Sequence, residues 1–223
     1  MKMPPWSYSS LTAFETCPRR YHITRVSKSV QEPQTEATIW GNRVHQALED
    51  RVIKKTPLPE GMQQWERIAA RFDTPKGTVF TETKMALNEN LQPCKWNDTN
   101  CYVRGIIDLG VDAGERATLL DWKTGKVKHD IDQLKLFTGL YMQSKPYVEE
   151  VRTGFIWLAH NKLTREDFTR SDLPKIWEDF FKRANKMNAA YENNKWGPNP
   201  SGLCNGWCPV GAHNCEYWKP KRF

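Results

Sequence analysis

The sequence predicts an α/β fold in which helices precede and follow a central sheet. Three stretches carry this prediction: apolar residues at helical spacing over residues 37–55, two apolar strands at 101–112 and 117–123 joined by a tight turn, and a long helical pattern over 173–194. The chain has 223 residues without internal repeats or low-complexity tracts, enough for one well-buried domain. We therefore expect a single domain over residues 1–223, with its core at about 37–160.

The other elements follow in order along the chain. Ser9 or Ser10 is expected to cap a first helix that runs to about Tyr21, with Cys17-Pro18 near its end or in a kink. The second helix is expected to close before Thr56-Pro57-Leu58-Pro59. Further expected elements are a helix at 61–72, a strand at 78–88, a helix at 133–143 and a strand at 151–159. The segments 90–100 and 160–172 carry no interpretable motif and are expected to be loops.

The tight turn between the two apolar strands brings acidic residues together. With Gly114 and Glu115 at the centre of a type II′ turn, the simplest register places Asp108 directly opposite Asp121. Opposed β-carbons are about 4.5–5.5 Å apart. Lys123, two residues after Asp121, points to the same face because side chains alternate along a strand. Opposed like charges need a compensating cation, so the pattern predicts a Mg²⁺ or Mn²⁺ site suited to phosphate chemistry.

The same residues also fit a simpler interpretation. Asp108 and Asp121 would then be ordinary turn-forming acids at strand ends, and Lys123 a solvated edge residue. The residues that lead up to each aspartate are apolar, however, so each carboxylate is expected to emerge from a buried strand. A buried acid needs a partner, and this favours the metal-site interpretation.

Five strings in one fixed order resemble RecB-like nucleases of the PD-(D/E)XK superfamily. They are Tyr8-Ser-Ser-Leu through Cys17-Pro-Arg-Arg-Tyr21, Gly41-Asn-Arg-Val-His45, Arg104-Gly-Ile-Ile-Asp108, Leu120-Asp-Trp-Lys-Thr-Gly125 and Gln133-Leu-Lys-Leu-Phe137. The resemblance implies a restriction-endonuclease-like core, a mixed central sheet flanked by helices. It also implies a divalent-metal-dependent DNA exonuclease that acts in recombination, repair or replication, as in phage exonucleases and CRISPR-associated RecB-type exonucleases.

The resemblance further implies roles for individual residues. Asp108, Asp121 and the backbone carbonyl of Trp122 would bind the catalytic Mg²⁺ or Mn²⁺, and His45 would complete or support a second metal position. Lys123 would orient the attacking water or help to deprotonate it. Without the surrounding motif, a lone histidine beside an apolar stripe is more often a packed structural residue.

Two more residues belong to this expected site. Gln133 would position DNA or the catalytic lysine, and Glu82, the one acid in the strand near residue 80, matches a strand glutamate of similar nucleases. The sequence departs from the family at Phe137, where a tyrosine is common, and Tyr141 lies one turn further on. This departure bears on the role expected of that helix and not on the residues expected to bind the metal.

Cysteines supply a second signal near the end of the chain. Six cysteines without secretory features argue against a disulfide framework, and three of them are clustered: Cys204, Cys208 and Cys215. Cys17 resembles the distant first ligand of the iron–sulfur branch of the family. In that branch the two chain ends, here about 8–21 and 200–218, are joined by a [4Fe–4S] cluster. The spacing differs from that branch and His213 offers another ligand, so structural Zn²⁺ and unligated thiols are the alternatives.

The net charge of +7 indicates a polyanionic partner, and charge alone would suit DNA or an anionic membrane equally. The chain lacks the apolar core of a signal peptide and any run of ~18 apolar residues, so we expect a cytoplasmic protein, in the host cytoplasm if viral. The expected partners are DNA with a free end and a recombination or replication protein. Two alternatives use the same sequence: a non-catalytic or partner-dependent DNA-binding module, and a structure-specific or nicking endonuclease.

Overall fold

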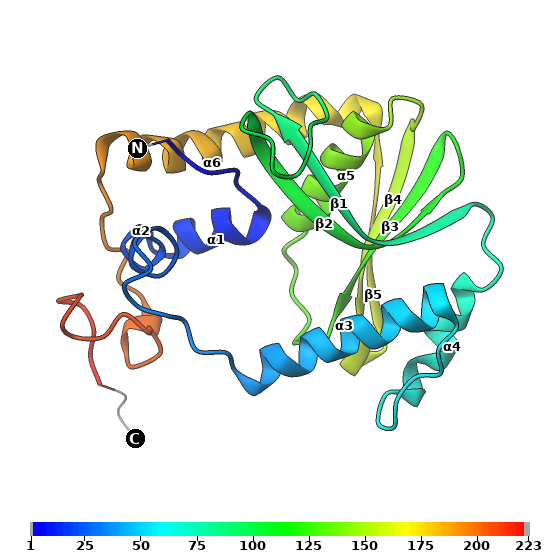
Figure 1. Ribbon diagram of the computed structural model, residues 1–223, viewed down its shortest axis with the longest axis horizontal. Helices are drawn as coiled ribbons and strands as arrows, with labels where there is room; N and C mark the ends of the chain where they lie inside the picture. The colour runs from blue at the N-terminus through cyan, green and yellow to red at the C-terminus, as the bar shows by residue number, and fades with distance from the viewer. Residues whose placement is uncertain (1, 221–223) are drawn as a thin grey trace. The chain divides into compact units, whose positions relative to one another are not determined.

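The computed structural model describes residues 2–220, and the chain divides into two compact units (Figure 1). Unit 1 comprises Met1–Gln34 with Asp179–Phe223, and unit 2 comprises Thr35–Glu178. Helix α6 (Leu173–Asn193) contributes residues to both units. No helix in the described part of the chain is both long and apolar enough to cross a membrane. That the whole chain forms one domain stays a prediction.

Unit 2 is built on a mixed five-stranded sheet in the order β1-β2-β3-β4-β5. The strands are β1 (Thr78–Asn88), β2 (Cys101–Asp112), β3 (Arg116–Lys123), β4 (Glu150–Trp157) and β5 (Lys162–Thr169). The β3–β4 pair is parallel and the other neighbours are antiparallel. The connection between the parallel strands runs through helix α5 (Asp132–Ser144). The expected α/β fold with a mixed sheet flanked by helices is confirmed.

Two helices cover opposite faces of the sheet where β3 ends. Helix α3 (Glu36–Lys54) buries an apolar stripe in a cluster that includes Trp122. Helix α5 presents Gln133 to Asp121, the neighbour of Trp122. Because successive side chains of a strand point to opposite faces, α3 and α5 lie on opposite sides of β3. This arrangement places polar groups from both helices around the last residues of one strand.

The hairpin between β2 and β3 has the register that the sequence predicts. Ala113 N donates to Arg116 O over 2.9 Å, and Gly114 takes the positive φ of 82° that a II′ turn requires at its first central position. The ladder runs from Asp112↔Ala117 to Leu109↔Leu120. Asp108 and Asp121 follow just beyond the last paired residues, and they are close enough for the charge of Asp121 to act on Asp108. The register is confirmed, and the direct opposition of the two aspartates on one face stays a prediction.

Unit 1 begins with a helix that is broken where the sequence has Cys17-Pro18. Ser7, and not Ser9 or Ser10, caps α1 (Tyr8–Thr16), because the Ser7 hydroxyl accepts from Ser10 N while the Ser10 hydroxyl bonds the Ser7 backbone in return. Cys17 is extended, with φ −166°, as expected of a residue that precedes proline. The short helix α2 (Pro18–Tyr21) and a π-helical turn, η1 (His22–Val26), follow. The predicted kink is confirmed, and the predicted cap was wrong.

Two further segments differ from the sequence-based expectation. Residues 61–72 form three short pieces, η2 (Gln63–Trp65), α4 (Glu66–Ala69) and η3 (Ala70–Phe72), in place of one helix. Residues 162–169 form the edge strand β5 and not a loop. Polar and charged residues dominate β5, so it lacks the apolar face by which a strand is recognised in sequence. The remaining short elements are η4 (Leu158–His160), η5 (Arg170–Asp172) and η6 (Gly202–Cys204).

Close packing between β4 and β5 requires a glycine at position 154. A Cβ there would lie 2.5 Å from the carbonyl oxygen of Thr164, which is backbone and cannot rotate away. We expect Gly154→Ala to lower the free energy of unfolding by about 1–3 kcal/mol in urea denaturation. Gly125→Ala is the matched control, because a Cβ at Gly125 meets nothing within 4 Å. Equal stability of the two variants would contradict this packing.

Candidate active site

Asp121 is buried at the end of β3 and held by two side chains. Gln133 Nε2 donates to Asp121 Oδ1 over 2.8 Å, and Lys123 Nζ lies 2.6 Å from Asp121 Oδ2. Lys123 Nζ also donates to Gln133 Oε1 over 2.9 Å. The three side chains thus form a closed triangle in which Gln133 orients both charged groups. These contacts fix the three side chains relative to one another.

Beneath the lysine lies an aromatic ring that the sequence did not single out. The Lys123 ammonium is 4.9 Å from the ring centroid of Phe155, which pairs with Asp121 across the parallel β3–β4 ladder. A cation over an aromatic face is stabilised by the ring quadrupole. Phe155 could not be found from sequence, because its place depends on the register between β3 and β4, in which Asp121 pairs with a residue 34 positions further along the chain.

A second group of polar side chains lies beside this triangle. One ligand atom each from His45, Glu82 and Asp108 come within 4.8 Å of one another. His45 Nδ1 lies 3.2 Å from Asp108 Oδ2, and His45 Nε2 lies 2.8 Å from the carbonyl oxygen of Trp122. The backbone N–H of Trp122 donates to Asp108 Oδ2 over 3.1 Å. The peptide groups of Trp122 therefore link this group to the buried Asp121.

The backbone of β1 is distorted where Glu82 joins this group. Glu82 has φ +43°, in the left-handed region that L-residues seldom occupy. Its neighbours Thr81 and Thr83 pair with Leu109 and Ile107, while Glu82 itself is left out of the ladder opposite Asp108. Strained backbone of this kind is found mainly at functional sites. At this distorted position Glu82 supplies the second carboxylate of the group, and no local sequence signal indicates the distortion.

Burial and mutual repulsion shift the acids toward their neutral forms. Burial, reinforced by the charges of Asp121 and Glu82, raises the pKa of Asp108 to about 9. Burial also raises the pKa of Asp121, against the opposing effect of Lys123. The pKa of Glu82 is raised by burial, and that of His45 is lowered by burial. A divalent cation among these groups would reverse the carboxyl shifts, because it stabilises the ionised forms.

The donor set suits a hard divalent ion. Two carboxylates and one imidazole nitrogen fit Mg²⁺ or Mn²⁺, with Mn²⁺ the more tolerant of nitrogen. In neutral His45, an Nε2–H that donates to Trp122 O leaves Nδ1 with a free lone pair on the side of Asp108. The carbonyl of Trp122, expected as a metal ligand, is engaged by His45 in this arrangement. Asp121 lies outside the group of three and is engaged by Lys123 and Gln133.

The structure thus brings together all the residues that the sequence nominated for this site. His45, Glu82 and Asp108 form one group, Asp121, Lys123 and Gln133 form the other, and Trp122 lies between them. The catalytic and ligand roles of these residues stay predictions. Tyr141 lies apart, since its hydroxyl donates to Asp112 Oδ2 over 2.7 Å.

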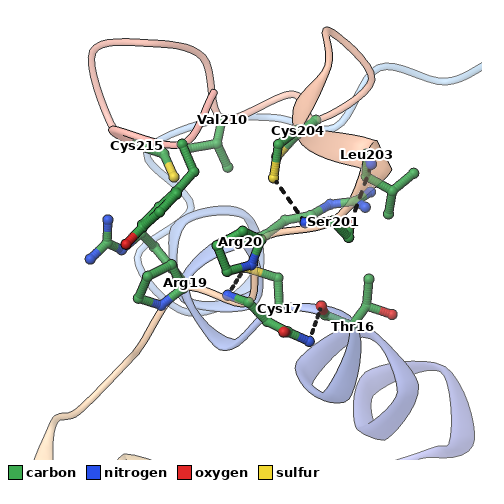
Figure 2. A pocket seen from close by; sticks show the side chains of 14 residues that line it. Thr16, Cys17, Arg19, Arg20, Ser201, Leu203, Cys204, Val210 and Cys215 are labelled. Atoms are coloured by element: carbon green, nitrogen blue, oxygen red, sulfur yellow. Dashed lines mark hydrogen bonds between the residues drawn. The ribbon is translucent and has the colours of Figure 1, made fainter. Parts of the chain in front are cut away.

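The four cysteines expected to bind a cluster line one hollow in unit 1 (Figure 2). This hollow, lined by Cys17, Cys204, Cys208 and Cys215 among others, has an empty volume of about 410 Å³ including space open to solvent. Asn199 N donates to Cys17 Sγ over 3.4 Å and Ser201 N to Cys204 Sγ over 3.5 Å. Figure 2 shows Cys204 and Cys215 directed into the same space. Backbone donors to sulfur are typical of thiolates that hold a metal centre.

Two arginines place positive charge beside these sulfurs. Arg19 is hydrogen-bonded to Cys215, and burial raises the pKa of the Cys208 thiol while the charge of Arg20 opposes that rise. The chain ends are also joined directly, since Asn199 Nδ2 donates to Thr16 O over 3.1 Å and Arg19 N to Gly197 O over 3.2 Å. The residues that line the hollow do not include His213.

A mixed α/β sheet with Asp108, Asp121 and Lys123 close together just beyond the β2–β3 ladder is the arrangement of a restriction-endonuclease-like nuclease. The chain belongs to the PD-(D/E)XK nuclease superfamily, whose family model matches residues 5–215. The match takes in all of unit 2 and most of unit 1.

Solved structures and curated proteins complete the comparison. A presumed exonuclease from Eubacterium rectale is similar in fold, with 13% identity, a TM-score of 0.54, and coverage of 95% of this chain and 88% of that chain. The protein SSO0001 is 13% identical with a TM-score of 0.41, over 82% of this chain and 77% of that chain. The sequence matches none of the curated proteins.

Because the pKa of Asp108 is raised, the stability of the metal-free protein in chelator should depend on pH. An aspartate has a pKa near 3.9 in unfolded chains, against about 9 here, so between these values only the folded state keeps the proton. Stability is then highest at low pH and is lost as pH rises, by up to about 1.4 kcal/mol per pH unit. We expect Asp108→Asn, which has no proton to lose, to gain thermal stability over the wild type increasingly from pH 5 to 8.

The exposed Glu60→Gln variant is the control, and it should follow the wild-type pH dependence. Parallel pH profiles for wild type and Asp108→Asn would show that Asp108 ionises normally in the fold.

Proposed function

We propose that this protein is a divalent-metal-dependent DNA exonuclease of RecB-like type. The observation that carries the proposal is the group His45, Glu82 and Asp108 beside the triangle of Asp121, Lys123 and Gln133. A ligand set and a fixed ammonium are what phosphodiester hydrolysis needs, because the attack adds negative charge to a group that is already anionic. Membership of the nuclease superfamily supports the same reaction.

The chain's own residues divide this work between them. His45, Glu82 and Asp108 would hold Mg²⁺ or Mn²⁺. Asp121, whose charge acts on both Asp108 and His45, would join them as a ligand. The bound ion would lower the pKa of a coordinated water and polarise the phosphate. Asp121 and Gln133 hold the Lys123 ammonium in place. From there Lys123 would orient the attacking water and stabilise charge that develops on the phosphate oxygens.

The proposed mode of cleavage is exonucleolytic. The fold resemblance to a presumed exonuclease and the RecB-like motifs favour attack from a DNA end. A structure-specific or nicking endonuclease would use the same residues. A non-catalytic DNA-binding module is less favoured, because an abandoned active site would not be expected to retain Asp108, Asp121 and Lys123 in this geometry. We further propose a cytoplasmic role in recombination, repair or replication, as in phage enzymes.

We also propose that Cys17, Cys204, Cys208 and Cys215 hold a [4Fe–4S] cluster. Tetrahedral Zn²⁺ with bonds of 2.3 Å draws its sulfurs to about 3.8 Å from one another. Among the described residues, His45, Glu82 and Asp108 are the three whose ligand atoms all lie within 4.8 Å of one another. No three of the four cysteine sulfurs are therefore as close together as 4.8 Å. This wider spacing of the sulfur atoms supports the larger centre over one zinc ion. The reducing cytoplasm would keep the thiols available as ligands.

Cleavage of end-labelled DNA tests the proposed activity. With Mg²⁺ or Mn²⁺ we expect degradation of linear DNA and no cut in matched closed circles, because an exonuclease needs an end. Asp121→Asn and Lys123→Ala should each reduce the rate by 100-fold or more, on the order of the loss of one charge-stabilising group. Glu60→Gln should cut like the wild type. Cleaved circles would establish an endonuclease, and binding without any cut would establish the non-catalytic module.

Metal analysis tests the proposed cluster. Protein purified without oxygen should contain iron and acid-labile sulfide, and Cys208→Ser should lose most of both together with thermal stability. Cys94→Ser is the control, because Cys94 does not line the hollow. Zinc without sulfide in the wild type would favour the zinc alternative. Unchanged metal content in Cys208→Ser would exclude either centre at these residues.

A further inference from the structure

A half-exposed strip extends from the site acids along the ribbon of β1 and β2. A Cβ on Gly105 would meet Leu140 of α5 at 2.8 Å, so this residue faces α5. Side chains alternate along a strand, and therefore Arg104, Ile106 and Asp108 point away from α5. These three are partly exposed while the residues between them are buried. The strip thus continues, on one face, from a proposed metal ligand.

Two cations lie on this strip. Lys84 pairs with Ile106, and Ala86 pairs with Arg104, so both cations belong to the same face of the β1–β2 ladder. Trp96, from the 89–100 connection, joins them. The Arg104 guanidinium carbon lies 4.8 Å from its ring centroid and the Lys84 ammonium 5.7 Å. Arg104 Nη1 is also 3.5 Å from the Trp96 carbonyl oxygen.

Neither cation is neutralised by a protein acid. In the described part of the chain no carboxylate forms an ion pair with Lys84 or Arg104, whereas many other cations, such as Arg51 and Lys123, are paired. A guanidinium stacked on an aromatic ring keeps its in-plane N–H donors, which match two phosphate oxygens at once. Trp96 therefore holds both cations near its ring, and Arg104 keeps donors besides the one that the Trp96 carbonyl accepts.

The distance from the acids suits a bound strand. Arg104 is four residues from Asp108, about 14 Å along a strand that rises about 3.4 Å per residue. A stacked nucleic acid strand also rises about 3.4 Å per nucleotide, so the interval spans about four nucleotides or fewer if the strand is stretched. Lys84, level with Ile106, lies midway along this interval.

We propose that Arg104 and Lys84, positioned by Trp96, clamp the backbone phosphates of the DNA strand whose phosphodiester is cut. The contacts would be made up to about four nucleotides from the reacting phosphate and would hold the strand in register with the site. The clamp rests on the proposed nuclease function for its purpose. Its binding can be measured without cleavage, so the two proposals fail separately.

Binding of a single-stranded DNA oligonucleotide in chelator tests the clamp. We expect Lys84→Gln and Arg104→Gln each to lower the affinity about fivefold or more. Each lost phosphate contact should also reduce the slope of log K against log salt by about 0.7. Arg104→Lys keeps the positive charge but loses the paired N–H donors of the planar guanidinium. It should therefore retain most of the salt dependence while binding DNA more weakly. Trp96→Ala should weaken binding, and Trp96→Phe should restore part of it.

Lys76→Gln is the matched control. Lys76 is exposed and lies just before β1, at the end of the strand remote from Lys84. It should leave the affinity and slope of the wild type unchanged. If Lys84→Gln with Arg104→Gln remains folded by circular dichroism and binds with the wild-type slope, the clamp is wrong. If the slope falls in that double variant but the wild type cuts no DNA with Mg²⁺ or Mn²⁺, the clamp stands and the proposed nuclease function falls.

Substrate length provides a second readout that a structural role would not produce. On oligonucleotides of two nucleotides the strand cannot reach Arg104, so wild type and Arg104→Gln should have similar KM values. On oligonucleotides of twelve nucleotides the KM of Arg104→Gln should rise about fivefold or more, with kcat little changed. An equal effect at both lengths would mean that Arg104 supports the fold and does not bind the strand.

Discussion

The burial of two neighbouring carboxylates is the constraint on which the rest of this structure depends. Asp108 and Asp121 lie close together just beyond the β2–β3 ladder, and their proximity in a poorly solvated place disfavours charge on both. A fold optimised only for stability would replace them with apolar or amide side chains. Retention of both acids is physically reasonable if a cation completes the site, since the ion then turns their repulsion into attraction for a ligand.

The surrounding elements can be understood as responses to this constraint. Lys123 and Gln133 stabilise Asp121, while His45 and the Trp122 amide bind Asp108. These partners come from both faces of the sheet, so the mixed topology is needed to assemble them. The left-handed conformation of Glu82 adds a third carboxylate at a cost in backbone energy. Such a cost is expected where a ligand and not the fold determines the local geometry.

Much of the fold was predictable because its signals are local. The turn at Gly114 and the apolar periods of β2 and β3 fixed the register, and with it the meeting of Asp108 and Asp121. Other features depend on contacts between distant segments. The place of Phe155 required the parallel β3–β4 pairing, and the strand β5 has too few apolar residues to be recognised. Glu82 was nominated from its strand, but its backbone distortion follows from the assembled site and leaves no trace in sequence.

The location of a bound Mn²⁺ ion would show whether Asp108, Glu82 and His45 form a metal site. Crystals grown with Mn²⁺ would reveal the metal by anomalous scattering, independently of any assay of activity. We expect a Mn²⁺ peak coordinated by Asp108, Glu82 and His45 Nδ1, with the Trp122 peptide still linking these ligands to Asp121. A Mn²⁺ ion bound elsewhere, or no peak at this position at millimolar Mn²⁺ and pH 8, would contradict it.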